Sequence, residues 1–317
     1  MDMICSSLKR NIHQFITDYT SCSILSTSSI ANFDQLDQSF MYSKLLNEII
    51  FDIEYNEKAK IEFVNVCREQ FSNNDIRLKI INDFESNYDC HSSIWWYTKE
   101  PIIYTILNQA LRKQDIEMII KMDSFVQDLH RQIEQIYFQT QQTEKMIIYR
   151  RQGMSNVEFE KLKKSEGGLL SFNNFLSTSI DREISFAFGN SARDDSDLTG
   201  ILFRMKIYPS FSSVPFTALD DISFYSNFDQ EILFSMHTIF RIGSMREIEN
   251  RLWQIDLTLT SNNDQQLKNV TEFIRNEIND GNRWMLLAGL MINMGKFDKA
   301  LEIYNTLLET ILNGTEK

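Results

Sequence analysis

Three short segments of this chain carry polar side chains that could act together on one substrate. Arg150 ends an apolar run that begins at Met146, a hydroxyl cluster follows Leu176, and two carboxylates flank Gln230 just before another apolar run. An arginine binds phosphate oxygens in a fork, and hydroxyls orient a neighbouring carboxylate. A carboxylate can hold a sugar hydroxyl and stabilise positive charge at an anomeric carbon. The three segments together indicate cleavage of a glycosidic bond in a phosphate-bearing sugar.

Each segment alone also has an ordinary structural explanation. A strand-end arginine such as Arg150 is often part of a surface ion pair, and a Ser/Thr run is often a turn. Acidic residues before a strand commonly solvate a loop. Glu231 is the exception, because a glutamate at the start of an apolar strand has no packing reason to be there. The functional interpretation therefore depends on all three segments meeting at one site.

The composition is that of a folded, acidic protein. Of 317 residues, 43% are hydrophobic and 24% charged, with only 3 prolines and 10 glycines, which argues against long low-complexity stretches. The length suits one large domain or two modest ones. A net charge of -12 excludes nucleic-acid binding through a general phosphate-attracting surface and favours basic protein partners.

The cysteines and the N-terminal sequence bear on location. The four cysteines all lie in the first third of the chain, with no CxxC pair and no histidine spaced for a zinc site. We expect reduced thiols and no bound metal. The first residues lack the uninterrupted apolar stretch of a signal peptide, and no segment is long and apolar enough to span a membrane. These features predict a cytoplasmic protein without membrane contact.

Hydrophobic periodicity divides the chain into stretches of different structure. Residues 1–38 are rich in Ser, Thr and Asn and form a poorly determined lead-in, whereas apolar residues recur at helical spacing from 40 to 139. Alternation with a period of two follows, most clearly over 201–207 and 253–259. The polar segments 190–199 and 208–228 are expected to be loops. Helices followed by strands, without βαβ alternation, predict an α+β fold.

The stretch from about residue 263 returns to helical spacing. Seven of its residues fall at tetratricopeptide consensus positions: Trp284, Leu287, Ala288, Gly295, Phe297, Ala300 and Tyr304. One such repeat needs a stacked neighbour, so we expect it to pack on the preceding helix or to belong to a longer array. A peptide- or protein-binding tail and a plain helical hairpin closing the domain are equally favoured.

The three polar segments resemble the Arg, Ser-Thr-Ser and Glu-x-Glu signatures of the mono-ADP-ribosyltransferases. The likeness is greatest to the arginine-modifying eukaryotic branch and its relatives with tetratricopeptide tails. The resemblance covers roughly residues 40–260. It implies an ADP-ribosyltransferase-like catalytic domain over 39–261, with a helical lobe (39–142) before a mixed or antiparallel two-sheet core (143–261). The helical tail then spans 262–317.

The resemblance also implies a role for each signature residue. Arg150 would grip the NAD pyrophosphate and the nicotinamide-side ribose. Ser177 would orient Glu231, with Thr178 and Ser179 shaping the strand that supports the pocket. Glu231 would be the catalytic carboxylate, binding the ribose 2′-hydroxyl and stabilising the oxocarbenium-like state as nicotinamide leaves.

Two positions depart from the family pattern. Asp229 stands where the family usually has glutamate, and it would orient or deprotonate the acceptor guanidinium with a side chain one methylene shorter. Arg151 stands where glycine is common, and it could substitute for Arg150 as the NAD-binding arginine. Phe186 and Phe188 are candidates for aromatic contact with nicotinamide or adenine, although a core role is expected for at least one of them.

The resemblance predicts an NAD(P)+–protein-arginine ADP-ribosyltransferase, a glycosyltransferase that releases nicotinamide. NAD would be the substrate, without a metal, and the partner would be an acceptor protein with an arginine. One alternative is an NAD glycohydrolase with weak transfer, because Asp229 positions the guanidinium poorly. Another is a non-catalytic NAD-binding adaptor, which the presence of Arg150, Ser177 and Glu231 disfavours.

Overall fold

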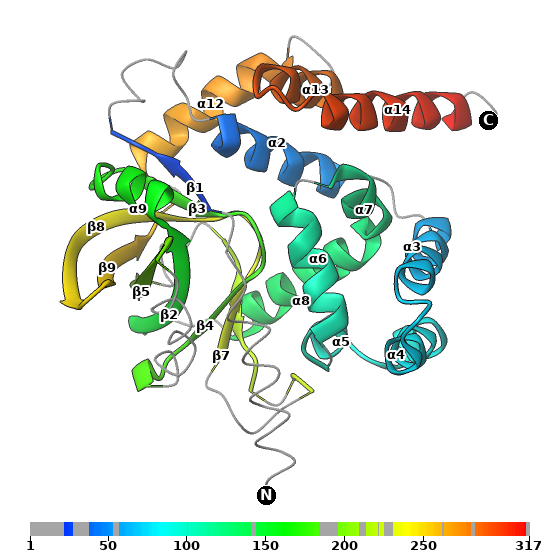
Figure 1. Cartoon of the computed structure of the whole chain (residues 1–317), viewed down its shortest axis with the longest axis horizontal. Helices are drawn as coiled ribbons and strands as arrows, with labels where there is room; N and C mark the ends of the chain where they lie inside the picture. The colour runs from blue at the N-terminus through cyan, green and yellow to red at the C-terminus, as the bar shows by residue number, and fades with distance from the viewer. Residues whose placement is uncertain are drawn as a thin grey trace, which may run out of the picture. The chain divides into compact units, whose positions relative to one another are not determined.

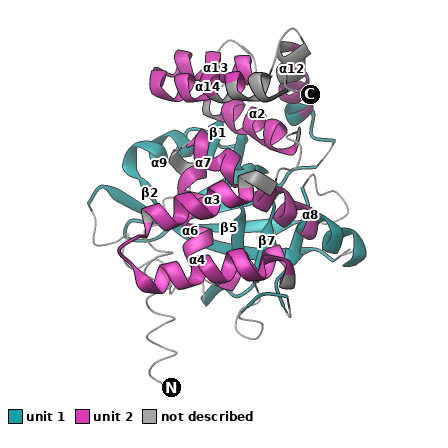
Figure 2. Cartoon of the chain, turned by 90° about the vertical axis from the view of Figure 1, so that its right-hand side faces the viewer, with its two compact units in different colours: residues 1–37, 133–267 teal, residues 38–132, 268–317 magenta. Residues whose placement is uncertain are grey.

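The structure is a computed structural model of the whole chain (Figure 1). It describes residues 22–27, 38–52, 57–99, 101–113, 115–140, 144–183, 196–208, 214–220, 222–224, 231–261, 263–279 and 283–314. The chain divides into two compact units (Figure 2). The sheet unit comprises Met1–Asp37 and Ile133–Leu267, and the helical unit comprises Gln38–Gln132 and Lys268–Lys317.

The first helical segment, which extends from the helical unit into the first residues of the sheet unit, confirms the helical periodicity predicted for residues 40–139. Its helices are α2 (Gln38–Asp52), α3 (Glu57–Gln70), α4 (Asp75–Asn87), α5 (Ser93–Lys99), α6 (Pro101–Lys113), α7 (Ile116–Lys121) and α8 (Asp123–Thr140), with a 3₁₀ turn η3 (Tyr88–Cys90). Asn74 caps α4 and Asp115 caps α7 by accepting backbone N–H bonds. Phe84 packs edge-on against Trp96 and Phe125, so aromatic rings build the centre of this unit.

The C-terminal helices follow α12 (Gln265–Asn279). They are α13 (Arg283–Asn293) and α14 (Phe297–Gly314), joined at Gly295, whose φ of 71° suits glycine. The two helices pack on each other, and α13 also packs on α2. Helix α14 also packs on α7, so both helices of the hairpin contact earlier helices of the same unit. The two expectations from the sequence, packing on the preceding helix or membership of a longer array, stay predictions.

The sheet unit contains nine strands that form one sheet among the described residues. They are β1 (Cys22–Leu25), β2 (Met146–Ser155), β3 (Leu169–Phe172), β4 (Leu176–Ser179), β5 (Leu198–Ile207), β6 (Phe216–Ala218), β7 (Glu231–Phe234), β8 (Thr238–Glu249) and β9 (Leu252–Leu259). The order is β1-β3-β8-β9-β5-β2-β4-β7-β6, with β5 and β9 parallel and the other pairs antiparallel. The α+β class and the mixed sheet are confirmed.

The two sheets expected from the resemblance are joined at one point. Strands β2 and β4 share a single paired position, Tyr149 opposite Ser179, whereas β2 pairs with β5 along its full length from Met146 to Ser155. The sheet therefore has a long part and a short part, β4-β7-β6, connected through that position. Helix α9 (Asn156–Lys163) follows β2 and is capped by the Ser155 hydroxyl.

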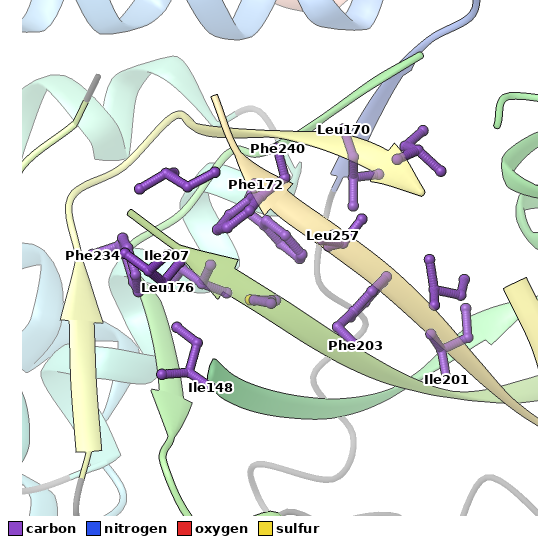
Figure 3. Packing of buried hydrophobic residues seen from close by; sticks show 14 of the residues in the cluster. Ile148, Leu170, Phe172, Leu176, Ile201, Phe203, Ile207, Phe234, Phe240 and Leu257 are labelled. Carbon is purple, nitrogen blue, oxygen red and sulfur yellow. The ribbon is translucent and has the colours of Figure 1, made fainter. Parts of the chain in front are cut away.

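The core of the sheet unit lies along one face of these strands. Figure 3 shows Phe172, Phe203 and Phe240 from three different strands packed together, and the rings of Phe172 and Phe203 meet edge-on at 5.5 Å. Leu176, Phe234 and Ile148 continue this cluster across β4, β7 and β2. Aromatic and branched side chains at alternate positions thus explain why the segments predicted as strands form a sheet.

Two strands lie in segments that the sequence had indicated to be irregular. β1 belongs to the stretch 1–38, and it pairs with β3 while Leu25 is fully buried. Gly168 makes this pairing possible, because a Cβ there would lie 2.3 Å from the Leu25 carbonyl oxygen. β6 falls within the expected loop 208–228 and pairs with β7. Both predictions of irregular structure were wrong at these residues.

Candidate active site

Strand alternation separates the polar side chains of β4 and β7 from the apolar ones. Leu176 and Ile232 belong to the core cluster, so the residues that alternate with them point away from that core. Those residues are Ser177, Ser179 and Glu231. The pairing of Ser179 with Glu231 places all three on one face of the two strands. A hydroxyl-and-carboxylate surface therefore forms beside an apolar core.

Ser177 and Glu231 are in direct contact. The Ser177 hydroxyl donates a hydrogen bond to Oε1 of Glu231, and both side chains are half-buried. The backbone partner of Ser177 is Leu233, so the contact crosses diagonally from one strand to the next. This bond is consistent with the orienting role that the resemblance implies for Ser177, and that role stays a prediction.

Arg150 reaches the same serine from β2. Its Nη1 donates to the backbone carbonyl oxygen of Ser177 at 2.7 Å, and its Nε donates to Oε1 of Gln152 at 3.4 Å. Arg150 follows the buried Ile148 by two residues, on the same face of β2, and lies opposite Phe203 on β5. Since β2 and β4 share only the position Tyr149 opposite Ser179, a long side chain can bridge the two strands there.

Thr178 and Ser179 brace the strand ends. The buried Thr178 hydroxyl donates to the carbonyl oxygen of Ile232 at 3.0 Å, and the Ser179 hydroxyl accepts from the Asp181 backbone N–H at 3.0 Å. These bonds tie β4 to β7 and fix the turn that leaves β4. The predicted supporting role of both residues is thus consistent with their contacts, while contact with NAD stays a prediction.

Arg151 differs from Arg150 in its surroundings. It is only 7% exposed, lies opposite Leu202, and by alternation points to the other face of β2. The described contacts with Ser177 come from Arg150. These contacts favour Arg150 as the arginine of the site.

Three predicted site residues lie outside the described residues: Asp229, Phe186 and Phe188. The structure therefore assembles Arg150, Ser177 and Glu231 from three strands and leaves the acceptor-side carboxylate and the aromatic contacts as predictions. Gln152 joins the assembled group without having been assigned a role from the sequence. The sequence alone carried no signal for this residue, because the burial of its side chain, only 6% exposed, is seen only in the structure.

The assembled group suits a substrate that is anionic at one end and becomes cationic at another. A half-buried guanidinium attracts phosphate, and a half-buried carboxylate stabilises nearby positive charge more strongly than it would in bulk water. Among the described residues, no group of three or more His, Cys, Asp or Glu side chains is arranged to hold a metal ion. No helix in those parts of the chain combines the length and apolar character needed to cross a membrane.

Comparisons with known proteins place the site strands within a protein family. A family model described as ADP-ribosyltransferase exoenzyme matches residues 90–276, more than half of the chain and all strands from β2 to β9. No curated protein matches the chain. The family match ends before α13 begins, so the C-terminal hairpin lies beyond it.

Several solved structures are similar at low sequence identity. Plx2a, an ADP-ribosyltransferase toxin from Paenibacillus larvae, is 18% identical, with 57% of this chain and 92% of that chain covered and a TM-score of 0.40. The Clostridium limosum C3 exoenzyme is 17% identical, with 53% and 83% covered and a TM-score of 0.39. The ADP-ribosyltransferase HopU1 of Pseudomonas syringae is 12% identical, with 65% and 99% covered and a TM-score of 0.41.

Proposed function

The chain belongs to the ADP-ribosyltransferase exoenzyme family, and from this premise we propose that it transfers ADP-ribose from NAD to an arginine side chain of a protein. Nicotinamide is the leaving group. The observation that carries the proposal is the position of Ser177, whose hydroxyl binds Glu231 while its carbonyl oxygen binds Arg150. One residue thus links a phosphate-binding cation to a carboxylate suited to an anomeric carbon.

Arg150 supplies the binding of the substrate in this proposal. Its planar guanidinium makes paired contacts with the diphosphate of NAD, which a point charge could not make. Its two described acceptors, the Ser177 and Gln152 carbonyl oxygens, are neutral groups. These two acceptors hold the guanidinium in place and carry no charge of their own, so neither of them opposes its attraction for phosphate.

Glu231 acts on the ribose next to nicotinamide. Its carboxylate accepts a hydrogen bond from the ribose 2′-hydroxyl and stabilises the positive charge that develops at C1′ as the C1′–nitrogen bond breaks. The bonding pair leaves with nicotinamide, which departs as a neutral molecule. Ser177 keeps the carboxylate turned toward that carbon, because its hydroxyl already occupies Oε1.

The acceptor completes the reaction. A guanidinium nitrogen of the acceptor arginine forms the new bond to C1′ and loses one proton, which Asp229 accepts or passes to solvent. Arginine as acceptor is supported by the spacing of Asp229 two residues before Glu231, which in extended backbone places both carboxylates on one side.

Hydrolysis of NAD is a second candidate activity, and one sequence feature favours it. Asp229 is one methylene shorter than the glutamate usual in the resembling family. A shorter carboxylate holds a guanidinium less closely to C1′, and water can then take its place. Transfer and hydrolysis share every step up to the departure of nicotinamide, so the two activities differ only in the acceptor.

In this proposal residues 39–261 form the catalytic domain, and the C-terminal tail contacts the acceptor protein. Helices α13 and α14 lie beyond the family match, and Phe297 and Leu301 on α14 are 67% and 60% exposed. Exposed apolar side chains one turn apart fit a contact with an acceptor protein. Replacing both with serine should lower labelling of lysate proteins while leaving nicotinamide release unchanged. Unchanged labelling would show that the tail is only a helical hairpin that closes the domain.

One experiment tests the activity itself. The protein is incubated with NAD labelled in the adenylate part, first with poly-arginine and then with cell lysate, while released nicotinamide and protein-bound label are counted separately. We expect both products, with bound label released by treatment that cleaves arginine conjugates. Nicotinamide without bound label would identify a hydrolase. Neither product, with Glu231→Gln indistinguishable from the native protein, would refute the proposal.

A further inference from the structure

A buried amide stands beside Arg150 on strand β2. Gln152 follows Arg150 by two residues, so both side chains are on the same face of the strand. Its cross-strand partner Ile201 and that of Arg150, Phe203, are fully buried, and Gln152 itself is only 6% exposed. An apolar side chain would suit this position better for packing, since a buried amide loses its hydrogen bonds to water.

The contacts of this amide fix which way it is turned. Oε1 of Gln152 accepts from Nε of Arg150 at 3.4 Å, while its buried Nε2 has no acceptor within the parts of the chain that the structure describes. The reverse orientation would turn amide N–H groups toward guanidinium N–H groups, which repel each other. The unpaired Nε2 donor of Gln152 therefore destabilises the fold, while Oε1 of the same amide supplies an acceptor for Arg150.

We propose that Gln152 is a positioning residue that holds Arg150 for its contact with the diphosphate of NAD. Gln152 fixes the Nε edge of the guanidinium, and the Ser177 carbonyl oxygen fixes Nη1. A side chain held at both edges loses less conformational entropy when it binds phosphate. This inference rests on the proposed function, because it requires Arg150 to bind NAD.

A neutral amide fits this role better than a carboxylate would. A glutamate at 152 would hold Nε more strongly, but its charge would offset the charge of Arg150 and weaken the attraction for phosphate. The amide keeps the acceptor and leaves the positive charge intact. The proposal therefore predicts that Gln152→Glu makes the Arg150 side chain more ordered and yet lowers the affinity for NAD.

The test compares the native protein with two variants at this position. Gln152→Met has similar volume and no acceptor, and Gln152→Glu has the acceptor and a charge. NAD affinity is measured by calorimetry, and stability is measured by urea unfolding. The rate of nicotinamide release is measured at saturating NAD. We expect both variants to bind NAD about tenfold more weakly, the typical effect of a lost bond to a charged group. Gln152→Met should unfold at the same or higher urea concentration, and its rate at saturating NAD should stay within about twofold of native.

The control is a second buried glutamine in the same sheet. Gln254 on β9 is 5% exposed, and its amide donates to Oδ1 of Asp256 at 3.0 Å. Gln254→Met should bind NAD as the native protein does. Together the two methionine variants separate the loss of a buried amide from the loss of the Arg150 contact.

Three results would overturn the inference. Native affinity in Gln152→Met would show that Arg150 needs no support from the amide. Equal loss of affinity and stability in that variant would make Gln152 a packing residue. Failure of the native protein itself to bind NAD would remove the proposed function together with this inference, so the two failures are distinguishable.

Discussion

Ser177 binds Glu231 across two strands although the residues are not backbone partners. The Ser177 hydroxyl donates to the Glu231 carboxylate, while the register sets Ser177 opposite Leu233 and Glu231 opposite Ser179. The diagonal contact leaves the backbone pairing of β4 and β7 undisturbed. It therefore constrains the carboxylate without being needed for the sheet, which allows catalytic and structural effects to be separated by mutation.

Glu231→Gln should abolish most nicotinamide release. The charge of the carboxylate is needed chiefly as C1′ becomes positive, so we expect release to fall about 100- to 1,000-fold. NAD binding should be largely intact, because glutamine still accepts a hydrogen bond from Ser177. Single-turnover kinetics and calorimetry measure the two effects. Near-native turnover would show that Glu231 is not the catalytic carboxylate.

Arg150→Lys should weaken NAD binding without unfolding the protein. A lysine keeps the charge but loses the fork that contacts two phosphate oxygens, and we expect affinity to fall about tenfold. Arg151→Lys is the matched comparison on the next residue, and it should have the smaller effect. A large loss for Arg151→Lys alone would assign NAD binding to Arg151.

Asp229 variants should change the ratio of transfer to hydrolysis. Asp229→Glu extends the carboxylate by one methylene and should raise that ratio, because the acceptor guanidinium is then held closer to C1′. Asp229→Ala should suppress transfer and spare hydrolysis. Both products are measured for the three proteins at the same NAD concentration. An unchanged ratio in both variants would place Asp229 outside the site.

Asp123 should make the helical unit less stable as pH rises. Burial raises the pKa of the Asp123 carboxyl to about 6, although the Ser124 backbone N–H counteracts this shift. Below the unfolded pKa of about 3.9 both states are protonated and the full stability is present. Between that pH and about 6 only the unfolded chain releases its proton, so stability falls, by about 3 kcal/mol in total.

Asp123→Asn should remove this fall in stability. The amide keeps an acceptor for the Ser124 N–H and carries no charge, so the contribution of residue 123 to the fall between pH 4 and 6, about the window of the shifted pKa, should disappear. Urea unfolding at several pH values measures the curve. Asp75→Asn, an exposed aspartate in the first turn of α4, is the control that should keep the fall. A fall of equal size in Asp123→Asn would exclude Asp123 as its source.

Gly168→Ala and Gly289→Ala should have opposite effects on stability. A Cβ at 168 would lie 2.3 Å from the Leu25 carbonyl oxygen and 2.9 Å from that of Ser165, so β1 must shift, at a cost of about 1–3 kcal/mol. Gly289 lies within α13 with nothing within 4 Å of such a Cβ, and alanine should stabilise the helix by up to about 1 kcal/mol. Equal unfolding midpoints would show that β1 does not depend on Gly168.

The helices of residues 40–139 and two of the long strands could be predicted because their signals are local. Apolar spacing located the helices of residues 40–139, and alternation located β5 and β9. β1 could not be found in this way, since a Ser-rich segment becomes a strand only through distant residues. Ser23 exchanges hydrogen bonds with Asn173, and Gly168 leaves room for Leu25. β6 has three residues, too few to show alternation.

The members of the site could be predicted, but their contacts could not. Residue types and order indicated Arg150, Ser177 and Glu231, whereas the choice between Arg150 and Arg151 depends on how β2 meets β4. The two strands share a single paired position, Tyr149 opposite Ser179, and nothing in their sequences predicts that pairing. The role proposed for Gln152 could not be predicted for the same reason, because its surroundings depend on the pairing of β2 with β5.

The pairing of β1 with β3 also governs how the chain must be made. Ser23 and its partner Asn173 are 150 residues apart, so a ribosome extends the chain for about 8–30 s before the first strand has a neighbour. Before β3 is synthesised, β1 has no strand to pair with. Once the buried strand Leu169–Phe172 has been made, its edge stays open until β1 pairs with it. Keeping residues 22–27 in every expressed form should therefore limit aggregation, because β1 covers that edge once it pairs with β3.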